Sequence, residues 1–137
     1  MKHIMLGYDA TPAADHALER TAEFAQMFGA KVTVASIARP LLPAGKGVGP
    51  IDPVDPPSLH EQEAAEAQKR LAELGVEADT VVGIGDPGKV IAHLAEQRHA
   101  DLIVVGSHRG PGLRRVFTGS VGDAVRHKAS CDVLAVR

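Results

Sequence analysis

The stretch from Leu102 to Val121, LIVVGSHRGPGLRRVFTGSV, decides the fold, because it joins an apolar strand to a glycine-rich loop and then to the start of a helix. We expect that helix to open at Gly119 and Ser120. The first backbone N–H groups of a helix have no partner within it, and the positive end of the helix dipole lies at the same place. An anion is the natural occupant of such a junction. The stretch therefore predicts an α/β protein with a loop suited to phosphate.

Strands and helices alternate along the rest of the chain. Short apolar or β-branched runs predict strands at 3–8, 31–37, 76–84, 101–105 and 132–136, and amphipathic runs predict helices at 13–28, 58–74, 89–98 and 120–128. Thr11 is expected to cap the first helix, and Ser58, with Glu61 at the capping-box spacing, the second. This alternation predicts an open, doubly wound, Rossmann-like sheet of five parallel strands with helices on both faces.

One proline-rich segment interrupts the alternation. Residues 39–57, between the second strand and the second helix, hold too many prolines and glycines for a regular helix and are predicted to form a loop. Two interpretations stay open: a surface excursion, or a loop that closes over a ligand. The whole chain, residues 1–137, is predicted to form a single domain.

An acidic turn is expected to face the glycine loop. Ligands of such sheets bind beyond the carboxyl ends of the strands, where the strand order reverses. Asp9 follows the first strand and Gly106 ends the fourth, so the two would share one crevice if these strands are neighbours. Asp9 could accept hydrogen bonds from a ribose or an adenine amino group, or it could be a turn residue that prepares the cap at Thr11. The sequence leaves both possibilities open.

The glycine loop combines flexible backbone with polar side chains. Its glycines permit close approach of the backbone to a ligand, its serine hydroxyls can bind phosphate oxygens, and its arginines suit phosphate. The same glycines would equally suit a tight crossover that binds nothing. The loop has no Gly-Lys-Ser/Thr run and does not follow the first strand, so it matches neither the Walker loop nor the dinucleotide fingerprint. No carboxylate neighbours His108, so no catalytic residue is assigned.

Composition narrows the function classes. The formal charge of -2 argues against a general affinity for nucleic acid. The 7 histidines are scattered and Cys131 is the single cysteine, so neither a metal site nor an internal disulfide is expected. No apolar run approaches the roughly 20 residues of a membrane span, and no signal peptide is recognised. These features favour a cytoplasmic protein.

Three segments of the chain resemble the universal stress protein family. GSHRGPGLRRVFTGSVGDAVRHKASCDVLAVR is similar to the C-terminal signature of that family, LGYDATPAADHAL to its first strand and acidic turn, and GDPGKVIAHLAEQRHADLIVVGSH to its third helix and fourth strand. The resemblance covers nearly the whole chain. It implies an adenine nucleotide alpha hydrolase-like fold and an ATP-binding module of the stress response, with Mg²⁺ held by the phosphates. It also implies a homodimer formed through the last strand, whose open apolar edge invites pairing.

The ATP-binding motif of the family is altered here. Binding members carry Gly, two residues, Gly, nine residues, then Gly-Ser or Gly-Thr; Gly106 and Gly119 hold the outer positions, but Arg109 stands at the middle one and Gly110 follows it. An arginine at this place either crowds the phosphates or contacts them. A nucleotide-free interaction dimer and a slow ATP hydrolase with His108 as base are therefore the alternatives. The nucleotide-binding residues that the resemblance implies are Gly7, Tyr8, Asp9, Ile37, Val105, Gly106, Ser107, His108, Arg109, Gly110, Gly119, Ser120 and Val121.

Overall fold

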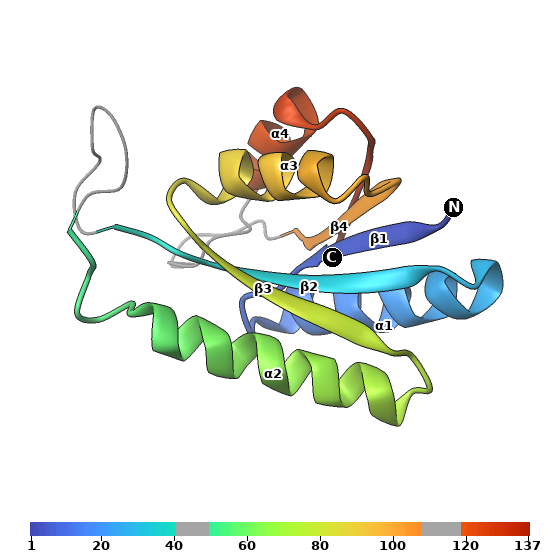
Figure 1. Ribbon diagram of the computed structural model, residues 1–137. Coiled ribbons are helices and arrows are strands. Elements are labelled where there is room, and N and C mark those ends of the chain that lie inside the picture. The colour runs from blue at the N-terminus through green and yellow to red at the C-terminus, as the bar shows by residue number, and fades with distance from the viewer. Residues whose placement is uncertain (41–49, 108–118) are drawn as a thin grey trace.

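Nine strands and helices make up the described part of the chain (Figure 1). The computed structural model describes residues 1–40, 50–107 and 119–137, with the backbone alone for 119–123. None of the helices described is long and apolar enough to cross a membrane. In chain order the elements are β1 (His3–Gly7), α1 (Pro12–Phe28), β2 (Lys31–Ala38), α2 (Pro57–Glu73), β3 (Ala78–Ile84), α3 (Pro87–Gln97), β4 (Leu102–Gly106), α4 (Gly119–Lys128) and β5 (Asp132–Val136).

The five strands form one parallel sheet in the order β3-β2-β1-β4-β5. β1 pairs with β2 on one side and with β4 on the other, so Gly7 lies opposite both Ala35 and Val105. Helices α1 and α2 cover one face of the sheet, and α3 and α4 cover the other (Figure 1). The predicted doubly wound α/β fold is confirmed, and the strand order reverses between β1 and β4.

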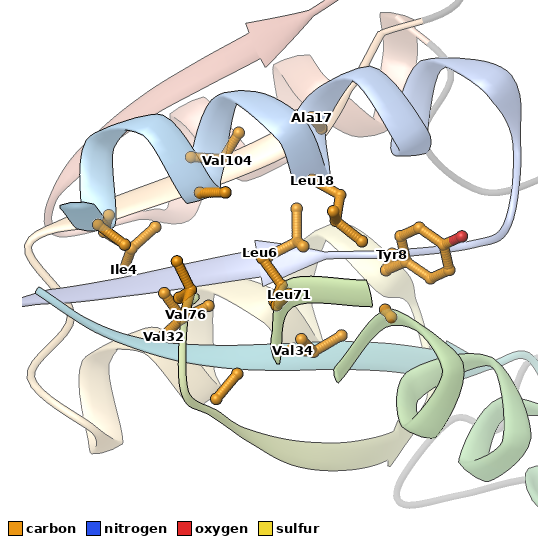
Figure 2. Close-up of a cluster of buried hydrophobic side chains, with 14 of the residues drawn as sticks. Ile4, Leu6, Tyr8, Ala17, Leu18, Val32, Val34, Leu71, Val76 and Val104 are labelled. Atoms are coloured by element: carbon orange, nitrogen blue, oxygen red, sulfur yellow. The ribbon is translucent and has the colours of Figure 1, made fainter. Parts of the chain in front are cut away.

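Each face of the sheet carries its own hydrophobic core, because successive side chains of a strand point to opposite faces. In β1, Ile4 and Leu6 belong to the core under α1 and α2, whereas Met5 belongs to the core under α3. Figure 2 shows the first core, in which Leu18 from α1 and Leu71 from α2 lie around the strands. All three β1 side chains are fully buried, which fixes the strand at the centre of the sheet.

The first two helices begin in different ways. Thr11 caps α1 as predicted, and its hydroxyl accepts a hydrogen bond from the backbone N–H of Ala14 at 3.2 Å. The predicted capping box of α2 at Ser58 is wrong, because the helix begins one residue earlier, at Pro57, and Pro56 precedes it without any side-chain cap. A proline at the first helical position has its φ already set and leaves no N–H to satisfy. The prolines therefore start α2 without a capping hydroxyl.

The C-terminus of α2 shows why β3 begins later than predicted. Gly75 adopts a left-handed φ of 81°, and its N–H bonds the carbonyl of Ala72 at 3.0 Å. The N–H of Val76 bonds the carbonyl of Leu71 at 2.8 Å, which completes a Schellman motif. Val76 is thus a buried residue of the C-terminal motif of α2, and the strand starts at Ala78.

The proline-rich loop, residues 39–57, is described only at its two ends. Residues 41–49 lie outside the described residues. Pro40 and Ile51 form an isolated antiparallel bridge, and the backbone N–H of Arg39 donates to Oδ2 of Asp55 at 3.0 Å. The described ends of this loop are therefore held together beside the end of β2.

Candidate functional site

The position at which the sequence predicts a crevice is the edge of the sheet where the strand order reverses. β1 and β4 are neighbours, with Gly7 opposite Val105, so Asp9 and Gly106 emerge at the same edge of the sheet. On the other side, the backbone N–H of Tyr8 donates to the carbonyl of Ala35 at 2.9 Å, which extends the β1–β2 register to the end of β1. The acidic turn therefore lies between the carboxyl ends of β2 and β4, the place where open α/β sheets bind ligands.

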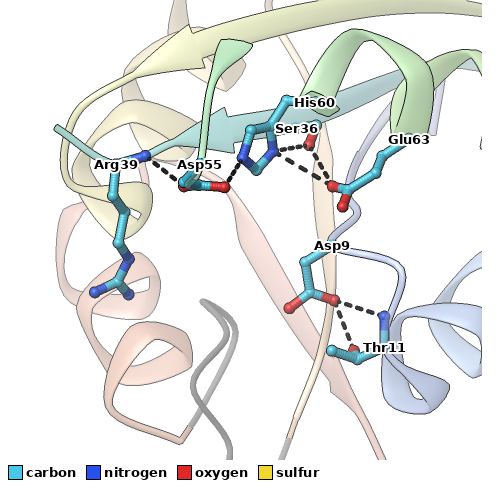
Figure 3. Close-up of polar contacts among 7 residues, drawn as sticks. All are labelled: Asp9, Thr11, Ser36, Arg39, Asp55, His60 and Glu63. Carbon is cyan, nitrogen blue, oxygen red and sulfur yellow. Dashed lines mark hydrogen bonds and ion pairs between the residues drawn. The ribbon is translucent and has the colours of Figure 1, made fainter. Parts of the chain in front are cut away.

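The two oxygens of the Asp9 carboxylate have different environments (Figure 3). Oδ1 accepts hydrogen bonds from the Thr11 backbone N–H at 3.1 Å and from the Thr11 hydroxyl at 2.6 Å. Oδ2 is buried and has no hydrogen-bond partner in the described part of the chain. A buried carboxylate oxygen without a donor is costly, so a donor from a ligand would suit it. The turn role expected for Asp9 uses Oδ1 and leaves Oδ2 without a donor among the described residues.

The turn after β1 has a strained backbone, and hydrogen bonds from its neighbours hold the Asp9 carboxylate in place. Ala10 has a φ of 59°, in the left-handed region that costs a residue with a Cβ about 1 to 2 kcal/mol. Its neighbours compensate, since the Thr11 hydroxyl donates to Asp9 and accepts from the Ala14 N–H. Strain that the surrounding structure sustains is typical of functional sites. The acidic turn is consequently fixed against the N-terminus of α1.

Gly106 brings the end of β4 against the first turn of α1. A Cβ at this position would lie 2.6 Å from both the carbonyl carbon of Ala13 and the nitrogen of Ala14. Only glycine allows this approach. The N-terminus of α1, which is the positive end of its dipole, therefore lies against the end of β4.

The other predicted site residues divide between the crevice and the part of the chain that is not described. Ile37 and Val105 are buried at the carboxyl ends of β2 and β4, in the core beneath α3. Ser107 continues β4, and its N–H bonds the carbonyl of Val136 at 2.6 Å. His108, Arg109 and Gly110 lie outside the described residues, and Gly119, Ser120 and Val121 form the start of α4, described by its backbone alone. The predicted residues at the ends of β1, β2 and β4 are thus described with their side chains, and those at the start of α4 by their backbone alone.

Tyr8 places its side chain away from this crevice. Its ring packs in the core under α1 and α2, and its hydroxyl donates to Oδ1 of Asp15 at 2.7 Å. Arg70 of α2 forms an ion pair with the same carboxylate. Burial, followed by the hydrogen bond to Asp15 and its charge, raises the pKa of Tyr8 to about 12, against a lowering by Arg70. This cluster joins α1 to α2, so Tyr8 can offer a ligand only its main chain.

A second polar cluster, which we call the His60 cluster, was not found from the sequence. It consists of Ser36, Asp55, His60 and Glu63, with the histidine ring at its centre (Figure 3). His60 and Ser36 are almost fully buried. Serine, histidine and aspartate side by side suggest a hydrolase, but a serine with no exposed surface cannot attack a substrate. One sequence signal was available, because His60 and Glu63 are three residues apart on one face of a helix.

Comparison with known proteins agrees with the observed fold and identifies the family. Residues 1–137 match the universal stress protein family. Universal stress protein A homolog 1 of Coxiella burnetii is 33% identical over 144 residues, covering 98% of this chain and 95% of that protein. Among solved structures, UspA from Lactobacillus plantarum superposes with a TM-score of 0.72 at 26% identity, covering 99% and 97% of the two chains. The universal stress protein from Archaeoglobus fulgidus in complex with dAMP gives a TM-score of 0.71 at 23% identity, covering 100% and 98%. The chain belongs to the universal stress protein family.

Proposed function

We propose that the crevice between the carboxyl ends of β1 and β4 binds an adenine nucleotide, and that the protein is an ATP-binding module of a stress response. The observation that carries the proposal is the buried Oδ2 of Asp9, which has no donor among the described residues. A ribose hydroxyl or an adenine amino group would supply that donor. Other universal stress proteins of this fold have been solved in complex with dAMP, cAMP and AMP, which supports this ligand class.

The phosphates would extend toward the N-termini of α1 and α4. Gly106 keeps the first turn of α1 close to the end of β4, and α4 begins at Gly119 with its dipole directed to the same edge of the sheet. In the described part of the chain no group of three acidic, histidine or cysteine side chains could hold a metal. Mg²⁺ would therefore arrive with the nucleotide, bound by its phosphates, where it would neutralise their charge. Arg109 and Ser120 are the side chains we expect to contact the phosphates.

A nucleotide-free interaction protein is the second candidate, and the edge strand β5 favours it. Its residues Val133 to Val136 are all only half-buried, although they are apolar and contribute to both cores. An apolar edge strand of this kind invites pairing with a second copy of itself. We expect a homodimer through β5 in either case. Sedimentation at increasing concentration should give the mass of two chains, and a single chain at every concentration would contradict the dimer.

Equilibrium dialysis with ATP and Mg²⁺ tests the binding proposal. Wild-type protein should bind saturably at millimolar ATP or below. Asp9→Asn keeps an acceptor for Thr11 but replaces the buried charge, and should weaken binding about tenfold or more, the value of a hydrogen bond to a charged group. Asp79→Asn is the matched control, because Asp79 is exposed near the start of β3, at the opposite edge of the sheet. Absence of binding by wild-type protein would refute the nucleotide proposal and leave the interaction dimer.

A further inference from the structure

The His60 cluster joins three segments of the chain through one imidazole ring. Nε2 of His60 lies 2.6 Å from Oδ1 of Asp55, in the loop before α2. Nδ1 lies 2.6 Å from the hydroxyl of Ser36 on β2 and 3.4 Å from Oε2 of Glu63, one turn further along α2. His60 is 1% exposed, so its hydrogen bonds are shielded from water.

Both ring nitrogens of His60 have a hydrogen-bond partner in either protonation state. In the neutral ring, Nε2–H donates to Asp55 and Nδ1 accepts from the Ser36 hydroxyl. In the protonated ring, Nδ1–H donates to the Ser36 oxygen, and the hydroxyl hydrogen turns to Oε2 of Glu63, which lies 3.3 Å away. No heavy atom has to move, so the histidine can gain or lose its proton in place. What changes is the charge of the imidazole ring itself.

Protonation offsets two carboxylates that face the same ring. Among the residues that the structure describes, the titratable groups facing His60 are Asp55 from the loop and Glu63 from α2, and β2 contributes the Ser36 hydroxyl. Burial lowers the pKa of His60, but hydrogen bonds to Glu63 and Asp55, and then the charges of both, outweigh it and raise the pKa above the usual 6.5. The protonated ring places a positive charge beside both carboxylates and forms charge-assisted bonds, whereas the neutral ring bonds Asp55 without that charge.

The bond between His60 and Asp55 reaches the nucleotide crevice through the main chain. Oδ2 of Asp55 accepts from the backbone N–H of Arg39 at 3.0 Å, directly after β2. Ile37, two residues earlier, is a predicted nucleotide contact, and the β1–β2 register places Asp9 beside this part of β2. The position of Asp55 therefore affects the backbone that forms one wall of the crevice.

We propose that His60 is a positioning residue that makes the attachment of Asp55 to the end of β2, and through it the nucleotide affinity of the crevice, dependent on pH. The protonated ring holds Asp55 against Arg39, and loss of the proton weakens that attachment and makes the surroundings more negative. Both effects lower the affinity for an anionic nucleotide as pH rises. The statement about affinity rests on the proposed function, whereas the statement about Asp55 and Arg39 does not.

NMR titration tests the attachment without any ligand. The Arg39 amide shift should follow the same midpoint as the His60 ring, and protection of this amide against hydrogen exchange, corrected for intrinsic rates, should fall above that midpoint. In His60→Gln the amide should lose this dependence, whereas His93→Gln, which removes an exposed histidine on α3, should keep it. Glu63→Gln should move the His60 midpoint to lower pH and provides a second variant should His60→Gln fail to fold. If neither the shift nor the protection of the Arg39 amide changed with the protonation of His60, the inference would be overturned.

Dialysis with ATP at a series of pH values then tests the affinity. Wild-type affinity should fall about fivefold across the His60 midpoint, a coupling at the lower end of those between linked sites. The affinity of His60→Gln for ATP should change with pH less than that of the wild type, by that factor. Comparing the two proteins cancels the contributions of the phosphates and of the other histidines, which both share. Equal profiles would refute the pH control of affinity. If no ATP binds at any pH, the proposed function fails, while the Arg39 titration still decides the inference about the cluster.

Discussion

Replacing Gly106 by alanine should destabilise the protein strongly, because the new Cβ would overlap with backbone atoms of α1. It would lie 2.6 Å from two backbone atoms of the first turn of α1 and 2.9 Å from the carbonyl oxygen of Ala13. Backbone atoms cannot rotate away as a side chain can, and Thr11 fixes this turn through its cap. Overpacking typically costs about 1 to 3 kcal/mol, and because the contacts here are with backbone atoms, we expect Gly106→Ala to cost about 3 kcal/mol.

Thermal unfolding followed by circular dichroism measures this cost. At about 4 °C per kcal/mol for a chain of this length, Tm should fall by roughly 12 °C. Gly29→Ala is the matched control, because a Cβ there meets no atom within 4 Å and only the left-handed φ of 63° is strained. That strain is worth about 1 kcal/mol, or roughly 4 °C. Equal losses in the two variants would refute the close approach of β4 to α1 on which the crevice depends.

Three further results are expected. Leu71→Ala, in the core under α2, should cost about 2 to 5 kcal/mol of unfolding free energy in urea titrations, whereas Leu74→Ala at the half-exposed end of the helix should cost roughly 0.5 kcal/mol. Tyr8 is the sole tyrosine and no tryptophan is present, so tyrosinate absorbance should show a pKa of about 12 that falls in Asp15→Asn, and an unchanged value in that variant would contradict the hydrogen bond. Because the pKa of His60 is raised in the folded protein, its stabilisation should be complete below about 6.5 and should decline as pH rises through the folded value. Urea unfolding of wild type and His60→Gln should show this as a difference in pH dependence, and parallel curves would argue against it.

The architecture could be predicted because local signals agreed with one another. Short β-branched runs alternated with amphipathic runs, and turn residues such as the Thr11 cap marked several boundaries. The proximity of Asp9 and Gly106 could be predicted from the rule that the ligand site of an open α/β sheet lies where the strand order reverses. Parallel pairing of β1 with β4 confirmed that prediction.

Features that depend on tertiary contacts were missed or misread. An apolar Val76 looks the same at the end of a helix as at the start of a strand, and only the hydrogen bond to Leu71 distinguishes the two. The His60 cluster draws residues from β2, a loop and α2, so the spacing of His60 and Glu63 on one helix indicates only part of it. The different environments of the two Asp9 oxygens likewise depend on burial, which a sequence does not report.

An NMR titration with ATP and Mg²⁺ tests the central claim most directly, because it shows both whether the nucleotide binds and where. We predict saturable amide shifts at residues 9–11, 37–39 and 105–107, around the carboxyl ends of β1, β2 and β4. Amides at 28–31 and 75–79, at the opposite edge of the sheet, should stay unchanged. No shifts at millimolar ATP, or shifts confined to that opposite edge, would contradict the assignment of the crevice as an adenine nucleotide site.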